Sequence, residues 1–147
     1  MCIRDRGLGA VASNYINLDT NGAKSSVSDG ITAISSSNFT VNTRGDVNAS
    51  SEKYIAYCFS EVKGFSKFGS WTGNGNADGP FIFTGFLPSL IIGKNVSRVE
   101  DWFMLDNKRD TFNPVDERLQ PNSNGAESTV TSLGIDFCAN GFKLRGA

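Results

Sequence analysis

The chain has 147 residues, a length that fits one domain whose folding buries roughly two-thirds of the surface of the extended chain. Its 14 Lys and Arg are balanced by 15 Asp and Glu, without a run of either sign, which argues against nucleic acid and anionic lipid as partners. Hydrophobic residues make up 39% of the chain, 11 of them Phe, and no apolar stretch approaches the ~20 residues that cross a bilayer. These values predict a soluble, globular domain.

The first six residues, Met1 to Arg6, read MCIRDR and lack the apolar region of a signal peptide. They resemble translated adapter sequence from assembled metagenomic reads, so we expect a single domain over residues 7–147. Without Cys2 the chain keeps Cys58 and Cys138, both within apolar runs. We expect two buried thiols in preference to an inter-strand disulfide.

The apolar residues form short runs bounded by Gly, Asn, Asp, Ser and Pro, without sustained helical periodicity, and this pattern predicts strands. Between the first two predicted strands the chain is rich in Ser, Gly and Asp, which predicts a loop or weak strand. Only Pro114 to Leu119 suggests a helix, of about one turn. In chain order, the predicted strands are Tyr15 to Leu18, Phe39 to Thr43, Tyr54 to Phe59, Phe65 to Thr72, Phe81 to Phe86, Leu90 to Lys94, Trp102 to Leu105, Ile135 to Cys138 and Phe142 to Arg145.

The run Tyr54 to Phe59, YIAYCF, gives the strongest strand prediction, because it is apolar on both faces, as a central strand of a β-sandwich is. The last two predicted strands flank Ala139-Asn140-Gly141, and an Asn-Gly pair favours a tight type I′ hairpin turn. We therefore expect an all-β antiparallel sandwich. Its predicted core comprises Ile55, Phe59, Phe81, Phe83, Ile91, Phe103 and Phe137.

The chain contains no histidine, which removes the commonest general base and metal ligand. Paired carboxylates could still hydrolyse a glycosidic bond. However, Glu100-Asp101 and Asp116-Glu117 are adjacent residues, whose side chains point to opposite sides of an extended chain. We expect no catalytic site and no cofactor.

The loop from Thr72 to Pro80, TGNGNADGP, places Asn74, Asn76 and Asp78 at alternate positions, as in a calcium-binding loop. The match is poor, because Asn replaces the first Asp and Gly85 stands where a bidentate Glu is needed. A turn between two strands is the favoured interpretation, without a metal site.

Trp71 precedes this loop and could stack on a sugar, while Asn74, Asn76 and Asp78 supply hydrogen bonds. These four residues form the candidate ligand site. A core role for Trp71 is at least as well supported, and Trp102, which lies within an apolar run, is expected to pack inside.

From Tyr54 onward three stretches resemble a domain of marine bacteriophage structural proteins such as tail fibres: YIAYCFSEVKGFSKFGSWTGNGNADGPFIFTGFLPSLIIGK, DWFMLDNKRDTFNPVDERL and GIDFCANGFKLR. That domain is similar to concanavalin-A-like and laminin-G-like jelly rolls, so the resemblance implies a jelly-roll sandwich on the virion surface. It also implies binding to a cell-surface glycan or another virion protein, or homo-oligomerisation in the parent protein. Relatives carry an apolar residue in place of Cys138, which implies packing and not a disulfide with Cys58.

The stretch from Asn38 that leads to Tyr54 has an echo that begins at Asn140. Phe39 precedes Tyr54 by 15 residues, so the tyrosine equivalent in the echo would lie at about position 157, after Ala147. We therefore expect the sandwich to lack one C-terminal strand and to have an unpaired edge. Two alternatives stay open: a carbohydrate-active enzyme of the same architecture and a calcium-dependent lectin.

Overall fold

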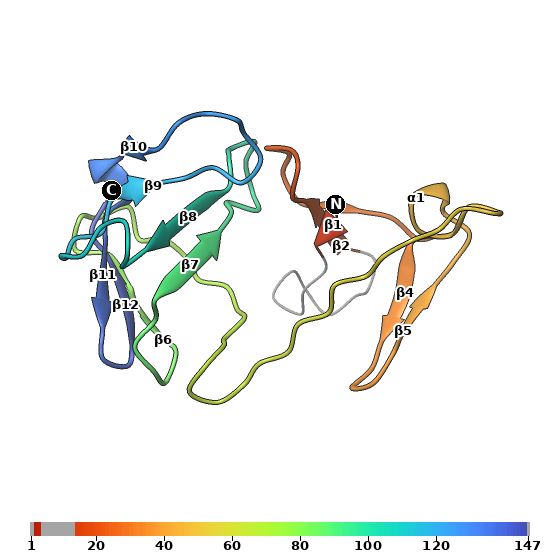
Figure 1. The fold of residues 1–147 in the computed structure, drawn as a ribbon, viewed down its shortest axis with the longest axis horizontal. Coiled ribbons are helices and arrows are strands. Elements are labelled where there is room, and N and C mark those ends of the chain that lie inside the picture. The colour runs from red at the N-terminus through yellow and green to blue at the C-terminus, as the bar shows by residue number, and fades with distance from the viewer. Residues whose placement is uncertain (1, 4–13, 147) are drawn as a thin grey trace.

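The computed structural model describes residues 2–3 and 14–146, and the described chain is built of strands and loops with very little helix (Figure 1). Its helical parts are one turn at Gly45–Asn48 (α1) and a 3-10 turn at Thr131–Leu133. No helix within the described ranges is long and apolar enough to cross a membrane. The strands are β1 (Cys2–Ile3), β2 (Asn14–Asn17), β3 (Ser25–Ser26), β4 (Ile31–Ile34), β5 (Phe39–Val41), β6 (Phe81–Phe83), β7 (Leu90–Gly93), β8 (Phe103–Asp106), β9 (Glu117–Arg118), β10 (Ser128–Thr129), β11 (Ile135–Cys138) and β12 (Gly141–Leu144).

Each named strand pair in the described chain is antiparallel. The strand orders are β11-β12-β6, β7-β8 and β10-β9 in one lobe, and β1-β2-β3 and β4-β5 in the other (Figure 1). The all-β antiparallel fold expected from the sequence is therefore confirmed.

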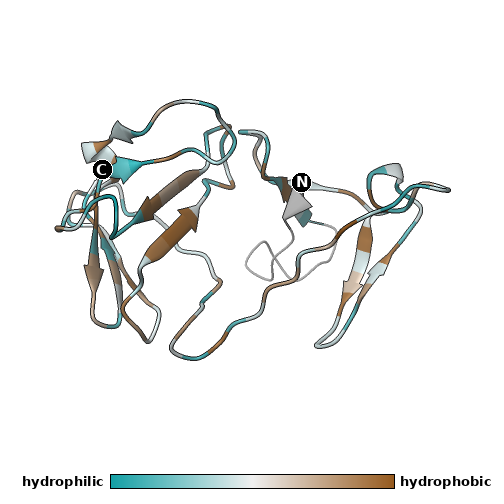
Figure 2. Cartoon of the chain, viewed as in Figure 1, coloured by the Kyte–Doolittle hydropathy of each residue, from teal (hydrophilic) through white to brown (hydrophobic). Residues whose placement is uncertain are grey.

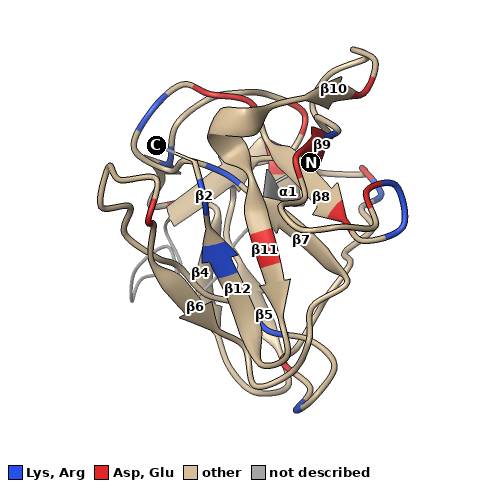
Figure 3. Cartoon of the chain, turned by 90° about the vertical axis from the view of Figure 1, so that its left-hand side faces the viewer, with Lys and Arg blue, Asp and Glu red and all other residues tan. Residues whose placement is uncertain are grey.

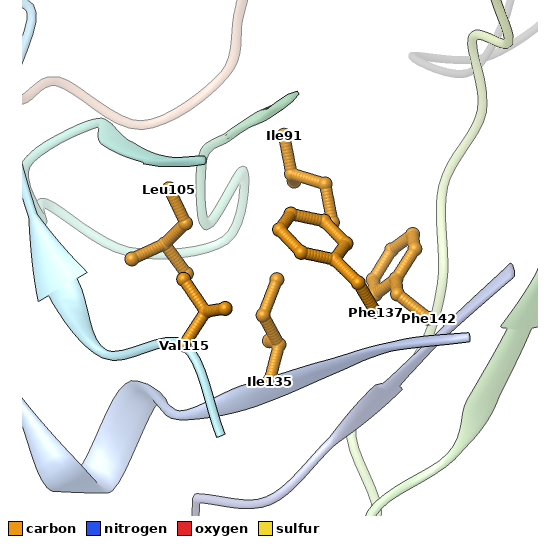
Figure 4. Close-up of a cluster of buried hydrophobic side chains, with 6 residues drawn as sticks. All are labelled: Ile91, Leu105, Val115, Ile135, Phe137 and Phe142. Atoms are coloured by element: carbon orange, nitrogen blue, oxygen red, sulfur yellow. The ribbon is translucent and has the colours of Figure 1, made fainter. Parts of the chain in front are cut away.

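The main core lies between the sheet β7-β8 and the sheet β11-β12-β6, which pack face to face (Figure 4). Alternation along β7 explains the contact: Ile91 is buried, whereas its neighbours Leu90 and Ile92 are about half exposed. Leu105 on β8 has no exposed surface at all. The six buried side chains of this cluster are Ile91, Leu105, Val115, Ile135, Phe137 and Phe142.

A second, smaller cluster joins β2 to the segment that leads into β8. Ile16 and Trp102 are buried against each other, with Leu18 and Val96 beside them. The indole Nε1 of Trp102 donates a hydrogen bond of 2.9 Å to the carbonyl oxygen of Asn17. The prediction that Trp102 packs inside is confirmed.

The strands predicted from Leu90 onward agree best with the structure, since β7, β8, β11 and β12 lie within a residue or so of their expected bounds. The core prediction is right for Ile91 and Phe137, and Phe103 packs against the core from the side. It is wrong for Ile55, Phe59, Phe81 and Phe83, which are exposed.

The strongest strand prediction, Tyr54 to Phe59, is wrong. This segment is extended but has no strand partner, and Phe65 to Thr72 likewise forms no strand beyond an isolated bridge between Val62 and Ser66. The apolar side chains of this segment favour a strand, but a strand also needs a neighbouring backbone to hydrogen-bond. The strand predicted over Phe81 to Phe86 ends at Phe83 in the structure. Beyond it, the backbone N–H groups of Thr84 and Gly85 both donate to Asn140 O, so the regular ladder of hydrogen bonds stops.

Two further expectations need correction. Pro114 to Leu119 is extended and not helical: Val115 bridges to Ile135, and β9 follows. The side chain of Asn113 fixes this course by donating to Phe137 O and accepting from Phe137 N. Both Cys58 and Cys138 are free thiols, but the expected burial is wrong: Cys58 is exposed because its segment is unpaired, and Cys138 is only partly buried.

The β11-β12 hairpin is confirmed, but its turn is not type I′. Cys138 pairs with Gly141, so Ala139 and Asn140 form the loop, and neither Asn140 nor Gly141 has a positive φ. Gly141 is required for a different reason. A Cβ there would lie 2.2 Å from the carbonyl oxygen of Ile82, so a side chain would push β6 away from β12.

We expect the substitution Gly141→Ala to lower the free energy of unfolding by about 1 to 3 kcal/mol, because β6 must shift to admit the methyl group. The matched control is Gly69→Ala, since a Cβ at Gly69 meets nothing within 4 Å. That control should change stability by no more than about 1 kcal/mol. Urea denaturation of the two variants would measure the difference, and equal effects would contradict the close approach of β6.

Candidate functional site

The most unusual surface of the molecule is the extended chain over residues 54–71, which we call the aromatic segment. It crosses from α1 in one lobe to the other lobe, visible as the yellow to yellow-green trace in Figure 1. Apolar stretches recur along it in Figure 2. Its large apolar side chains are all more than one-third exposed: Tyr54, Ile55, Tyr57, Phe59, Val62, Phe65, Phe68 and Trp71.

Local hydrogen bonds hold the start and the middle of the aromatic segment. At its start, the hydroxyl of Tyr54 donates to Gly45 O at 2.6 Å and accepts from Ala49 N at 2.9 Å, which ties the segment to α1. Farther along, Gly64 takes a positive φ of 77° in a turn where Val62 N donates to Ser66 O. The aromatic side chains are thus displayed from a backbone that is anchored, although much of it is unpaired.

The predicted ligand loop, Thr72 to Pro80, follows directly and is exposed from Thr72 to Asp78, as expected. Its polar side chains bind the loop itself. Asn74 Oδ1 accepts from Asn76 N at 3.1 Å, and Asn76 Oδ1 accepts from Asp78 N at 2.9 Å. These are side-chain-stabilised turns of the kind that Asn forms readily.

The end of the loop is tied to β12 through Lys143. Its Nζ lies 2.8 Å from Asp78 Oδ1 and donates to Gly79 O at 2.9 Å. The hydrogen bond and the positive charge of Lys143 hold the pKa of the Asp78 carboxyl below its ordinary value of 3.8. Lys143 therefore balances the charge of Asp78, which is the one charged residue of this loop. Charges of both signs are scattered over the side of the molecule seen in Figure 3.

Trp71 stands at the base of the loop, as expected, and it serves the core as well as the surface. Its ring meets the buried ring of Phe142 edge to face, with 5.6 Å between centroids. With 37% of its surface exposed, part of the indole remains open to solvent. The structure thus brings the four candidate residues into one region but does not make them converge on a cavity.

The geometry favours the turn interpretation of the loop over a calcium site. A calcium ion needs six to eight oxygen ligands. Here the amide oxygens of Asn74 and Asn76 point at backbone N–H groups, and Asp78 faces a lysine. Within the described residues no three His, Cys, Asp or Glu side chains gather as metal ligands would.

An open polar depression lies between the turn after β2, the residue Asp101 before β8 and the loop between β9 and β10. Asp101 accepts there from Gln120 Nε2 at 2.6 Å and from Asn122 Nδ2 at 2.8 Å. Across the depression, a backbone hydrogen bond keeps the pKa of Asp19 below its ordinary value. The lining residues are Asp19, Thr20, Asn21, Asp101, Asn122, Ser123 and Asn124.

This depression does not provide the pair of groups that glycoside hydrolysis needs. One carboxyl of such a pair must stay protonated to serve as the general acid, which requires a raised pKa. The pKa of Asp19 is lowered, and both oxygens of Asp101 are occupied by amide donors. Only the run of small polar residues in both loops could have drawn attention to it in the sequence.

The fold and this surface define an antiparallel all-β domain that displays aromatic side chains. The chain belongs to the family described as domain of unknown function DUF7483, which it matches over residues 1–147. No curated protein and no solved structure matches the chain significantly.

We expect Lys143→Met to raise the pKa of Asp78 toward 3.8, because the substitution removes the main group that stabilises the carboxylate. A carboxyl group whose pKa is lowered in the folded state stabilises the fold at pH values above its unfolded-state pKa. That contribution is lost as the pH falls through the folded-state pKa. The variant should therefore lose less stability on acidification. NMR titration of the Asp78 carboxyl carbon would measure the pKa directly.

The matched control is Lys67→Met, which breaks the 3.1 Å ion pair between Lys67 and Glu61. That variant should leave the Asp78 pKa unchanged. An unshifted Asp78 in Lys143→Met would show that the loop is not tied to β12 in solution.

Proposed function

We propose that this domain is a non-catalytic structural module on the surface of a bacteriophage particle, where the aromatic segment binds a partner protein of the particle. The resemblance of residues 54–145 to a domain of phage structural proteins supports the location. The two packed antiparallel sheets agree with a jelly-roll sandwich, the finer topology that this resemblance implies.

One observation carries the binding role: eight large apolar side chains are exposed in a row over residues 54–71. Large contiguous apolar surfaces on folded proteins mark interaction sites, and aromatic residues are enriched in the centres of protein interfaces. The absence of any charge run in this chain also suits a neutral partner surface better than a nucleic acid.

The genes that flank the coding sequence test the location. If the domain is part of a virion, we expect capsid, portal or tail genes beside it, because phage structural genes are grouped. A flanking cluster of polysaccharide-degradation genes would contradict the proposal and favour a carbohydrate-active enzyme.

Glycan binding at the ligand loop is a second candidate, and one specific observation favours it. The partly open indole of Trp71 stands beside an exposed loop that displays Asn74, Asn76 and Asp78. A sugar ring stacks on an aromatic face and accepts hydrogen bonds from amides, without any need for metal or net charge.

For this candidate we expect the double substitution Trp71→Ala with Asn76→Ala to weaken binding on a glycan array about tenfold or more. The matched control is Phe68→Ala, which removes an exposed aromatic side chain outside the loop and should leave binding intact. A thermal melt would check that the double variant stays folded, since Trp71 also contacts Phe142. Binding that survives the double substitution would place the site elsewhere.

A further inference from the structure

The part of the aromatic segment from Ile55 to Phe59 has the composition of a strand and no partner. None of its backbone N–H groups donates a hydrogen bond within the described residues. In an extended chain, Ile55, Tyr57 and Phe59 point to one side. They are 83%, 72% and 77% exposed, so this side is a ready-made apolar strand face.

The chain also carries a strand edge of matching character. β6 is the last strand of the sheet β11-β12-β6, so alternate backbone groups along its far edge face away from β12. Phe81 and Phe83 share its outer face and are 46% and 65% exposed. β6 itself, Phe-Ile-Phe, carries none of the charged or polar side chains that commonly protect the edges of monomeric sheets.

We propose that two copies of this chain exchange these elements: Ile55–Phe59 of each copy adds to the edge of β6 in the other. The sheet then has four strands, and Ile55, Tyr57 and Phe59 lie beside Phe81 and Phe83 as cross-strand apolar pairs. The exchange is reciprocal, so the assembly closes as a two-fold symmetric dimer. The inference rests on the proposed function, because it names the partner that the aromatic segment binds.

The anchoring of the segment favours a second copy over closure within one chain. The hydroxyl of Tyr54, one residue before the proposed strand, is fixed to α1 by two hydrogen bonds. The lobe that contains α1 lies apart from the lobe that contains β6 (Figure 1). The strand therefore begins on the far side of the molecule from its own β6.

The exposed apolar area sets an upper limit on what the exchange can bury, and this limit is close to that of a standard-size interface. With about 200 Å² for each large side chain, the exposed fractions of Ile55, Tyr57, Phe59, Phe81 and Phe83 correspond to roughly 700 Å² per copy. Each partner in a standard-size interface contributes about 800 Å². The added backbone hydrogen bonds come on top of this apolar area.

Sedimentation velocity should show the unmodified chain as a dimer. We expect Tyr57→Lys, at the centre of the exchanged face, and Phe83→Lys, on the edge, each to raise the dimer dissociation constant about 30-fold or more. The matched control is Phe112→Lys, which changes an aromatic side chain that is 82% exposed outside both elements and should leave the dimer intact.

Mixing the two weakened variants gives the sharpest test. Tyr57→Lys keeps an intact edge and Phe83→Lys keeps an intact strand, so the mixed dimer has one of the two junctions whole. Native mass spectrometry should detect this heterodimer at concentrations where each variant alone is monomeric. Because only folded chains can complement each other, the result also excludes misfolding as the cause of dissociation.

Three outcomes would overturn the exchange: a monomeric parent chain, equal dissociation by Phe112→Lys, or no heterodimer on mixing. Hydrogen exchange distinguishes the exchange between two copies from strand addition within one chain. Protection of the Ile55–Phe59 amides in a monomer would indicate addition within one chain and would also refute the inference. Failure here would leave the virion role standing if structural genes flank the coding sequence. If the dimer is confirmed but the flanking genes do not encode virion proteins, the virion role alone is refuted.

Discussion

The fold depends on the face-to-face contact between β7-β8 and β11-β12-β6. Two-stranded sheets are at best marginally stable alone in water, so β7-β8 needs a second layer. Leu105 and Ile135, both almost fully buried, supply the centre of that contact, and Val115 closes its side. Burying each such side chain stabilises the fold by about 1.5 to 3 kcal/mol. Outside this core, β2 is held by the smaller cluster of Ile16 and Trp102, and the aromatic segment is held mainly by local hydrogen bonds.

The sequence was most informative where a strand and its partner are close in the chain. In the pairs β7-β8 and β11-β12 each strand is followed in the chain by its partner, so both apolar patterns lie in one stretch of sequence. The run from Tyr54 to Phe59 failed because apolar composition describes a strand's side chains and not its neighbour. No local feature says whether another backbone lies beside it.

In the candidate site, too, the local features follow from the sequence and the non-local contacts do not. The exposure of the loop and its turns follow from Gly and Asn at positions 73–76, so local rules were enough. The tie between Asp78 and Lys143 joins residues that the fold brings together across much of the chain. The edge contact of Trp71 with Phe142 is equally non-local, which is why the sequence left its role undecided between core and surface.

Most phenylalanine side chains of a single copy of this chain are not buried, although the residue is typical of protein cores. The chain has 11 Phe, yet Phe137 and Phe142 are the ones buried in the described core. Apolar surface left in water costs free energy in proportion to its area, so a sequence this rich in aromatics gains more by covering them. Five of the exposed ones lie on the aromatic segment and on β6, whereas Phe39 and Phe112 lie elsewhere. Because Ile55–Phe59 and the outer edge of β6 lack strand partners, one partner could satisfy both their side chains and their hydrogen bonds. An apolar ligand could cover the rings, but only another strand can also pair the backbone.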